Sequence, residues 1–220
     1  MIDLPPDPTI DEMRDALAPL VASNAAFDGW NGHAVDAAAD RLGLDRDVAR
    51  LAFPGGAADM IDAWFAHVDR AMLDRLPPET LAAMKIRQRI AALVEARLDL
   101  LAPDREALRR ALAILAMPQN VARAARLGWR AADVMWRAAG DTATDYNHYS
   151  KRTLLTGIYA ATVTVFLDDE SEGQGDTRAF LSRRIDNVMQ FEKAKAKWTG
   201  KSHRLSLSRF VGRLRYPPAA

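Results

Sequence analysis

The chain has 220 residues, of which 49% are hydrophobic and 27% charged, which is the composition of a folded globular protein with an apolar core. It has no cysteine, which excludes disulfide bonds, zinc–cysteine centres and thiol nucleophiles. The net charge of +1 is unevenly spread, because residues 193–220 carry eight lysines and arginines and no acid, whereas residues 1–192 carry 22 bases and 29 acids. An acidic body with a basic tail suits an anionic partner, either a lipid surface or a nucleic acid.

Helical periodicity runs through nearly the whole chain, and no stretch alternates as a strand does, so we expect an all-α fold of about ten helices. The acidic, proline-rich segment Met1–Pro8 is not typical of a signal peptide, and no run of about 18 apolar residues suggests a membrane span. We therefore expect a cytoplasmic protein. The expected helices cover about Thr9–Ala26, Asn31–Gly43, Asp45–Phe53, Ala57–Arg75, Glu79–Leu101, Asp104–Ala116, Pro118–Ala139, Asp145–Leu167, Asp176–Trp198 and Ser202–Leu214.

Residues 1–75 have an architecture of their own: one helix, then a helix pair joined at Leu42–Leu44, then a long helix after Phe53-Pro54. This order resembles the N-terminal helix-turn-helix of the TetR repressor class. A DNA reader needs basic residues to neutralise phosphates. Residues 28–56 instead hold three arginines against five aspartates, so we expect the scaffold to be kept without its DNA-binding role.

Catalytic motifs are missing from the sequence. There is no GxGxxG, P-loop or GxSxG motif, and the four histidines are scattered. The spacing Asp145-x-x-His148 occurs once, whereas a di-iron bundle needs two Glu-x-x-His pairs and two further glutamates. The acidic segment Asp168–Glu172 could bind a divalent cation, but its composition favours an ordinary solvated loop. We therefore expect no catalytic residues, metal or cofactor, and a protein that is not an enzyme.

The middle of the chain carries a polar signature. Met117-Pro118-Gln119-Asn120 is followed by Trp-Arg-Ala-Ala-Gly-Asp-Thr-Ala-Thr-Asp-Tyr-Asn-His-Tyr-Ser-Lys-Arg at residues 136–152. This stretch is similar to the ubiquinone-biosynthesis lipid-binding family whose eukaryotic member is the ninth Coq protein, and the resemblance covers about residues 28–192. It implies a degenerate TetR fold that holds isoprenoid or other lipid and presents quinone precursors to a flavin-independent hydroxylase at the membrane.

On matching positions, the resemblance also implies a surface that meets this hydroxylase. Arg152 lies two helical turns after Asp145, and Tyr149 lies one turn from each, so the three can share a face. That face is either a partner site or a local lattice of ion pairs, and Asp141 and Asp145 are also placed to cap a helix start. His148 stands where animal members have tryptophan. The candidate partner-binding residues are Met135, Asp145, Asn147, His148, Tyr149 and Arg152.

The lipid pocket that the resemblance implies would be lined by the apolar faces of the later helices. Residues at this spacing can equally be plain core. The candidate lipid-binding residues are Leu112, Leu115, Met117, Leu155, Ile158, Tyr159, Thr162, Val163, Phe166, Phe180 and Ile185.

The basic tail forms an amphipathic pattern. Its apolar residues fall within about one third of a helical wheel and its arginines lie outside that arc, as in helices that lie in a membrane interface. The same pattern would let the tail pack on the body or on a second subunit. The candidate membrane-binding residues are Leu207, Phe210, Val211, Leu214, Arg204, Arg209, Arg213 and Arg215.

These features predict three parts: a helix-turn-helix-like unit at residues 1–75, a helical lipid-binding domain at 76–200 and a membrane-binding tail at 201–220. We expect a homodimer that binds an isoprenoid or phospholipid, a ubiquinone-pathway hydroxylase and the inner face of the cell membrane. The alternative is a TetR-type transcriptional regulator that binds DNA and a hydrophobic effector.

Overall fold

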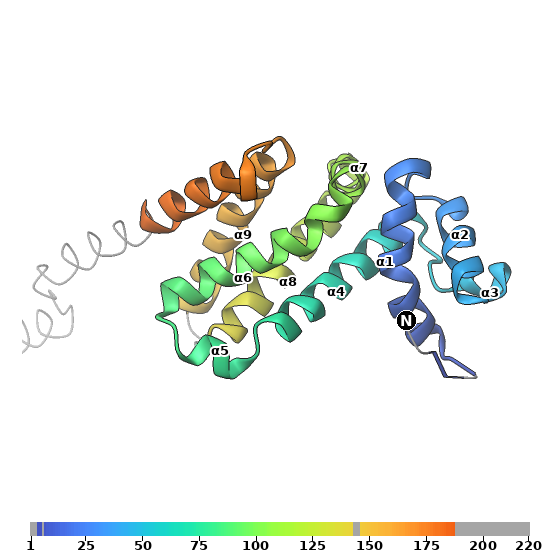
Figure 1. The fold of residues 1–220 in the computed structure, drawn as a ribbon, viewed down its shortest axis with the longest axis horizontal. Coiled ribbons are helices and arrows are strands. Elements are labelled where there is room, and N and C mark those ends of the chain that lie inside the picture. Colours follow the sequence, from blue (N-terminus) through green and yellow to red (C-terminus); the bar gives the residue numbers. More distant parts are fainter. Residues whose placement is uncertain (1–3, 6, 143–145, 188–220) are drawn as a thin grey trace, which may run out of the picture. The chain divides into compact units, whose positions relative to one another are not determined.

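A computed structural model describes residues 4–5, 7–142 and 146–187. All regular secondary structure in these residues is helical, which confirms the expected all-α class (Figure 1). The chain divides into two compact units, Met1–Leu181 and Ser182–Ala220, and the contacts described below lie within the first.

Three short-range caps determine where the N-terminal helices begin. Helix α1 (Ile10–Asp28) begins with a capping box, in which Thr9 Oγ1 accepts from the amide of Glu12 at 3.3 Å and Glu12 Oε2 accepts from the amide of Thr9 at 2.8 Å. Asn31 caps α2 (Gly32–Leu42) and Asp45 caps α3 (Arg46–Leu51). All three starts are as the sequence predicts.

The turn between α2 and α3 needs a left-handed residue, and Gly43 supplies it with φ of 68°. The arginines of α3 point back to α2. Arg46 makes two hydrogen bonds of 2.8 Å to Asp40, and Arg50 bonds Asp36 at 2.8 and 2.5 Å. These ion pairs hold both guanidinium groups against carboxylates of the same unit.

Helix α4 (Ala57–Arg75) runs from the α1–α3 unit to α5 (Figure 1). The sequence predicts one helix over Glu79–Leu101, and the structure corrects this to α5 (Pro78–Ala82) and α6 (Ile86–Leu101). The break is stabilised by side chains that bind the freed backbone groups. Gln88 accepts from the amide of Lys85 at 3.0 Å, and Arg89 donates to the carbonyl of Met84 at 2.9 Å.

A proline-containing 3₁₀ turn precedes each of the next two helices, and the first helix follows Asp104 as the sequence predicts, whereas the second begins at Val121, three residues after the expected Pro118. Turn η1 (Ala102–Asp104) leads into α7 (Arg105–Leu115), and η2 (Pro118–Asn120) leads into α8 (Val121–Ala138). Helix α9 (Tyr146–Leu167) follows, then η3 (Glu172–Gln174) and a helix described over 175–187.

The acidic segment after α9 is not simply solvated. Asp169 is buried, and its carboxylate accepts hydrogen bonds from the amide and hydroxyl of Ser171, at 2.9 and 2.5 Å, and of Thr177, at 2.8 and 2.5 Å. These bonds hold the pKa of the Asp169 carboxyl far below its usual value. The segment therefore fixes the chain between α9 and the next helix.

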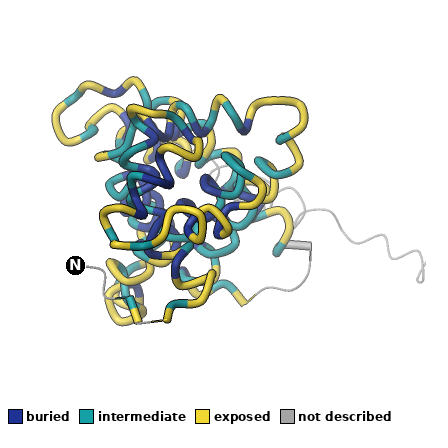
Figure 2. The backbone as a smooth tube through the Cα atoms, turned by 90° about the vertical axis from the view of Figure 1, so that its right-hand side faces the viewer, coloured by how far each residue is buried: buried dark blue, intermediate teal, exposed yellow. Residues whose placement is uncertain are grey.

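The buried residues lie where the helices face one another (Figure 2). Helix α1 packs against α2 and α4, and the rings of Trp30 and Trp64 lie 5.4 Å apart. The indole of Trp30 donates to the carbonyl of Ala107 in α7 at 3.0 Å. The N-terminal helices therefore share their core with α4 and α7.

Candidate functional site

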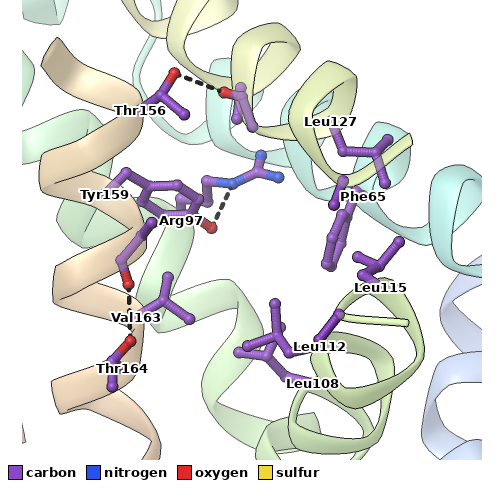
Figure 3. A pocket seen from close by; sticks show the side chains of 15 residues that line it. Phe65, Arg97, Leu108, Leu112, Leu115, Leu127, Thr156, Tyr159, Val163 and Thr164 are labelled. Carbon is purple, nitrogen blue, oxygen red and sulfur yellow. Dashed lines mark hydrogen bonds between the residues drawn. The ribbon is translucent and has the colours of Figure 1, made fainter. Parts of the chain in front are cut away.

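A cavity of about 390 Å³ lies among α4, α6, α7, α8 and α9 (Figure 3). This volume is in the range of pockets that hold small organic ligands. Most of the wall is aliphatic or aromatic, and the polar lining comes from α6 and α9. The lining residues are Phe65, Arg97, Leu108, Leu112, Leu115, Ala116, Ala124, Leu127, Gly128, Ala131, Thr156, Tyr159, Ala160, Val163 and Thr164.

Four of the expected lipid-binding residues line this cavity: Leu112, Leu115, Tyr159 and Val163. Leu155, Thr162 and Phe166 are buried in the core and do not line the cavity. The remaining four do not line it either: Met117 is 44% exposed, Ile158 and Phe180 are half-buried, and Ile185 belongs to the second unit.

The sequence prediction missed the walls formed by α4, α6 and α8. On α8 the lining positions Ala124, Gly128 and Ala131 follow helical spacing, and their small side chains leave space beside α9. At Gly128 the two helices approach closely, since a Cβ there would lie 3.0 Å from Thr156 Cγ2. A stripe of small residues on one helix face was the signal available in the sequence.

The polar part of the cavity wall is a charged network. Arg97 is 2% exposed, and it donates from Nε to Tyr159 Oη at 2.8 Å and from Nη1 to Asp69. Asp69 also accepts from Arg130 at 3.2 Å, and Arg130 pairs with Asp62. The guanidinium of Arg97 lies over the rings of Tyr159 and Phe65, at 5.4 and 5.8 Å from their centroids. Among the described lining residues, none is a carboxylate or a histidine.

A second polar cluster joins α8 to the start of α9. Arg152 is 1% exposed and donates to Asp133 at 2.5 Å and to Asp141 at 3.1 Å. Lys151 Nζ also donates to Asp141, at 2.6 Å. Burial by itself raises the pKa of the Asp141 carboxyl, but the hydrogen bonds from Lys151 and Arg152 outweigh it and hold that pKa below its usual value. Asp141 thus binds two side chains of α9, and residues 143–145, which precede that helix, lie outside the described residues.

The expected partner-binding residues are split by this arrangement. Arg152 and Met135 are buried, whereas Tyr149 is 62% exposed. The ring of Tyr149 lies 5.1 Å from that of His148 and 6.1 Å from that of Trp129. Asp145 and the side chain of Asn147 lie outside the described residues. Among the described side chains of the expected face, the exposed one is the aromatic Tyr149, whereas Arg152 is a buried ion-pair centre.

The expected membrane-binding helix, including Leu207, Phe210, Val211 and Leu214 with Arg204, Arg209, Arg213 and Arg215, lies outside the described residues. Within the part of the chain that the structure describes, no helix has the length and apolar character of a membrane span.

Comparison with known proteins bears on both sites. Residues 121–192 match the COQ9 family model. The chain is 34% identical to the mitochondrial ubiquinone biosynthesis protein COQ9 of Rattus norvegicus over 169 residues, which are 73% of this chain and 54% of that protein. It is 32% identical to the Homo sapiens protein of the same name over 168 residues, 73% of this chain and 52% of that one. The chain thus spans about half the length of the curated relatives it matches.

In fold, the chain is similar to the crystal structure of a TetR transcriptional regulator from Nitrosomonas europaea. The TM-score is 0.65 and the identity 28%, and the match covers 81% of this chain and 98% of that one. Both resemblances stated from sequence are confirmed. The chain therefore carries the COQ9 family segment, at residues 121–192, on a TetR-like helical fold.

Proposed function

We propose that this protein is a lipid-binding accessory protein of ubiquinone biosynthesis, which takes an isoprenoid or quinone-precursor lipid into the cavity and presents it to a hydroxylase at the membrane. The observation that carries the proposal is the apolar cavity, two of whose walls, α8 and α9, fall within the segment that matches COQ9. Each methylene buried there contributes about 0.8 kcal/mol. Since the described lining offers no acid–base pair, the proposed role is binding without turnover.

Solvent extraction of the purified protein followed by mass spectrometry tests this role, and we expect co-purified isoprenoid or quinone-precursor lipid. Ala160→Phe places a ring in the cavity from an exposed position and should abolish lipid occupancy. Ala113→Phe is the control, since Ala113 is exposed on α7 and does not line the cavity. Absence of such lipid in the wild type, or equal occupancy in both variants, would contradict the proposal.

For the hydroxylase, we propose the aromatic surface formed by the exposed Tyr149 with the half-buried His148 and Trp129. Exposed aromatic rings are frequent anchors of protein interfaces. Tyr149→Ala should reduce co-purification of the hydroxylase while lipid occupancy stays unchanged. Retention of the full amount of hydroxylase by this variant would exclude the surface.

For the membrane, we propose that residues 201–220 attach the protein reversibly to the inner face of the cell membrane. A short apolar face supplies weak insertion, and each basic residue near an anionic leaflet adds about 1 kcal/mol. Deleting residues 201–220 should abolish co-sedimentation with anionic vesicles at low salt. Equal sedimentation of the truncated protein would contradict the attachment.

We also propose that the protein is a homodimer. Sedimentation velocity of the full-length chain measures this directly, and a monomer mass would contradict it.

A DNA-binding function is the alternative that the TetR-like fold suggests. The ion pairs Arg46–Asp40 and Arg50–Asp36 argue against it, because they engage the basic groups of α3 that would face phosphates. A gel-shift assay with duplex DNA at low salt should show no retardation by the protein. Specific retardation of an operator fragment would favour the regulator.

A further inference from the structure

One part of the cavity wall differs from the rest. Arg97 and Tyr159 place a guanidinium and a phenol beside a surface formed mainly by leucine, valine, alanine and phenylalanine (Figure 3). Burying a charged group at an apolar wall is costly unless it is paired and hydrogen-bonded. A wall that only had to hold hydrocarbon would be simpler to build without this pair.

The hydrogen bonds at this wall leave the hydroxyl proton of Tyr159 available to donate. Tyr159 Oη accepts the 2.8 Å bond from Arg97 Nε, and a phenol that accepts one bond still has its own proton to donate. The two threonines that line the cavity differ in this respect. Thr164 Oγ1 donates to the carbonyl of Ala160 at 3.1 Å, and Thr156 Oγ1 donates to that of Arg152 at 2.8 Å. Tyr159 is therefore the hydroxyl best placed to donate into the cavity.

The network behind Tyr159 is balanced in charge. Arg97 and Arg130 carry two positive charges, and Asp69 and Asp62 carry two negative ones. Asp69 bridges the two arginines, with one oxygen on each. Because the positive charge of Arg97 is already compensated, an anionic head group would lose its hydration without gaining a net counter-charge. A neutral acceptor has a much smaller hydration to lose and gains the hydrogen bond.

We propose that the Arg97–Tyr159 wall is a polar subsite that binds a neutral hydrogen-bond acceptor on the head of the lipid, such as a ring carbonyl, through the hydroxyl of Tyr159. The lipid chain then lies along the apolar wall formed by α7 and α8. Arg97 acts as a positioning residue, since its Nε–H holds Tyr159 Oη and directs the hydroxyl proton toward the ligand. This inference rests on the proposed function and adds the chemical class of the head group.

Three probes of similar shape separate the possibilities: 4-geranylacetophenone, a neutral ketone; 4-geranylcumene, which replaces the carbonyl by hydrocarbon; and 4-geranylbenzoate, an anion at pH 7. Their affinities for the delipidated full-length chain are measured by tryptophan fluorescence titration. In the wild type the ketone should bind more tightly than the benzoate. In Tyr159→Phe the ratio of ketone to cumene affinity should fall about five- to tenfold, the size of one hydrogen bond. Thr164→Val is the matched control and should leave that ratio unchanged.

The carbonyl stretch of the bound ketone gives a readout that a purely structural network would not move. In the wild type it should lie below its frequency in hexane, because a donor is bound to the oxygen, and in Tyr159→Phe it should return to the hexane value. If Tyr159→Phe fails to fold, as loss of cumene binding would reveal, the wild-type spectrum decides alone, and a hexane-like frequency there overturns the subsite.

The other outcomes are equally decisive. A ketone-to-cumene ratio within twofold of the wild type in folded Tyr159→Phe would mean that the network only joins helices. Tighter binding of the benzoate than of the ketone would exclude a neutral head group. Binding of all three probes with equal affinity would contradict the polar subsite but not the proposal that the cavity binds lipid. Binding of none of the three probes would contradict both the subsite and lipid binding in the cavity.

Discussion

Replacing Arg152 by methionine removes a buried charge and leaves an apolar side chain of similar length. Asp133 and Asp141 then lose a partner while remaining at the joint between α8 and α9. Removing one member of a buried ion pair costs about 3–5 kcal/mol. Asp141 keeps Lys151 at 2.6 Å, and Asp133 keeps Arg137 at 2.9 Å, so the lower end, about 3 kcal/mol, applies.

For a chain of this size, about 3 kcal/mol corresponds to a fall in Tm of about 6–12 °C. Urea unfolding followed by circular dichroism measures the free energy of unfolding directly, with an unchanged m-value as the check on two-state behaviour. Tyr149→Ala is the companion variant. Because Tyr149 is 62% exposed and loses mainly ring contacts, it should cost about 1 kcal/mol or less. A cost below 1 kcal/mol for Arg152→Met, or equal costs for both variants, would refute this account of the joint.

Two further predictions concern stability elsewhere. Asp169→Asn places amide hydrogens among the donors of Ser171 and Thr177 and should cost about 2 kcal/mol at pH 7, measured by urea unfolding. Because the pKa of Asp169 is depressed on folding, its carboxylate stabilises the native state above the unfolded pKa of about 3.9 and this contribution is lost as the pH falls further. At pH values below about 4, the urea concentration at the unfolding midpoint should therefore decrease more steeply with falling pH in the wild type than in the variant. Thr9→Ala removes the cap of α1 and should lower stability by about 1 kcal/mol by the same assay, and a neutral effect would exclude that role.

Sequence reasoning succeeded where the decisive contacts are local. The starts of α1, α2 and α3 depend on Thr9, Asn31 and Asp45, each of which binds an amide two or three residues away. The break before α6 was missed because it depends on side chains of α6 that reach back to the chain before it. Periodicity carries no record of such a contact.

The cavity shows the same limit more sharply. On α9 the apolar spacing marks Tyr159 and Val163, which line the cavity, and Leu155 and Phe166, which fill the core, in the same way. Apolar residues recur at the same helical spacing whether they face another side chain or an empty space. Arg97 carried no signal at all, because its partners Asp69 and Tyr159 are 28 and 62 residues away.

The sequence by itself determined the all-α class, the caps of α1, α2 and α3, the acidic character of the helix-turn-helix-like segment and the relationship to COQ9, since composition, short-range spacing and a local motif carry these. Only the tertiary structure decided that Arg152 is a buried ion-pair centre whereas Tyr149 is exposed, and that one face of α9 borders a cavity with a polar wall. The physical reason is that burial and charge compensation depend on groups brought together from distant helices, and no single helix records which of its faces will meet them.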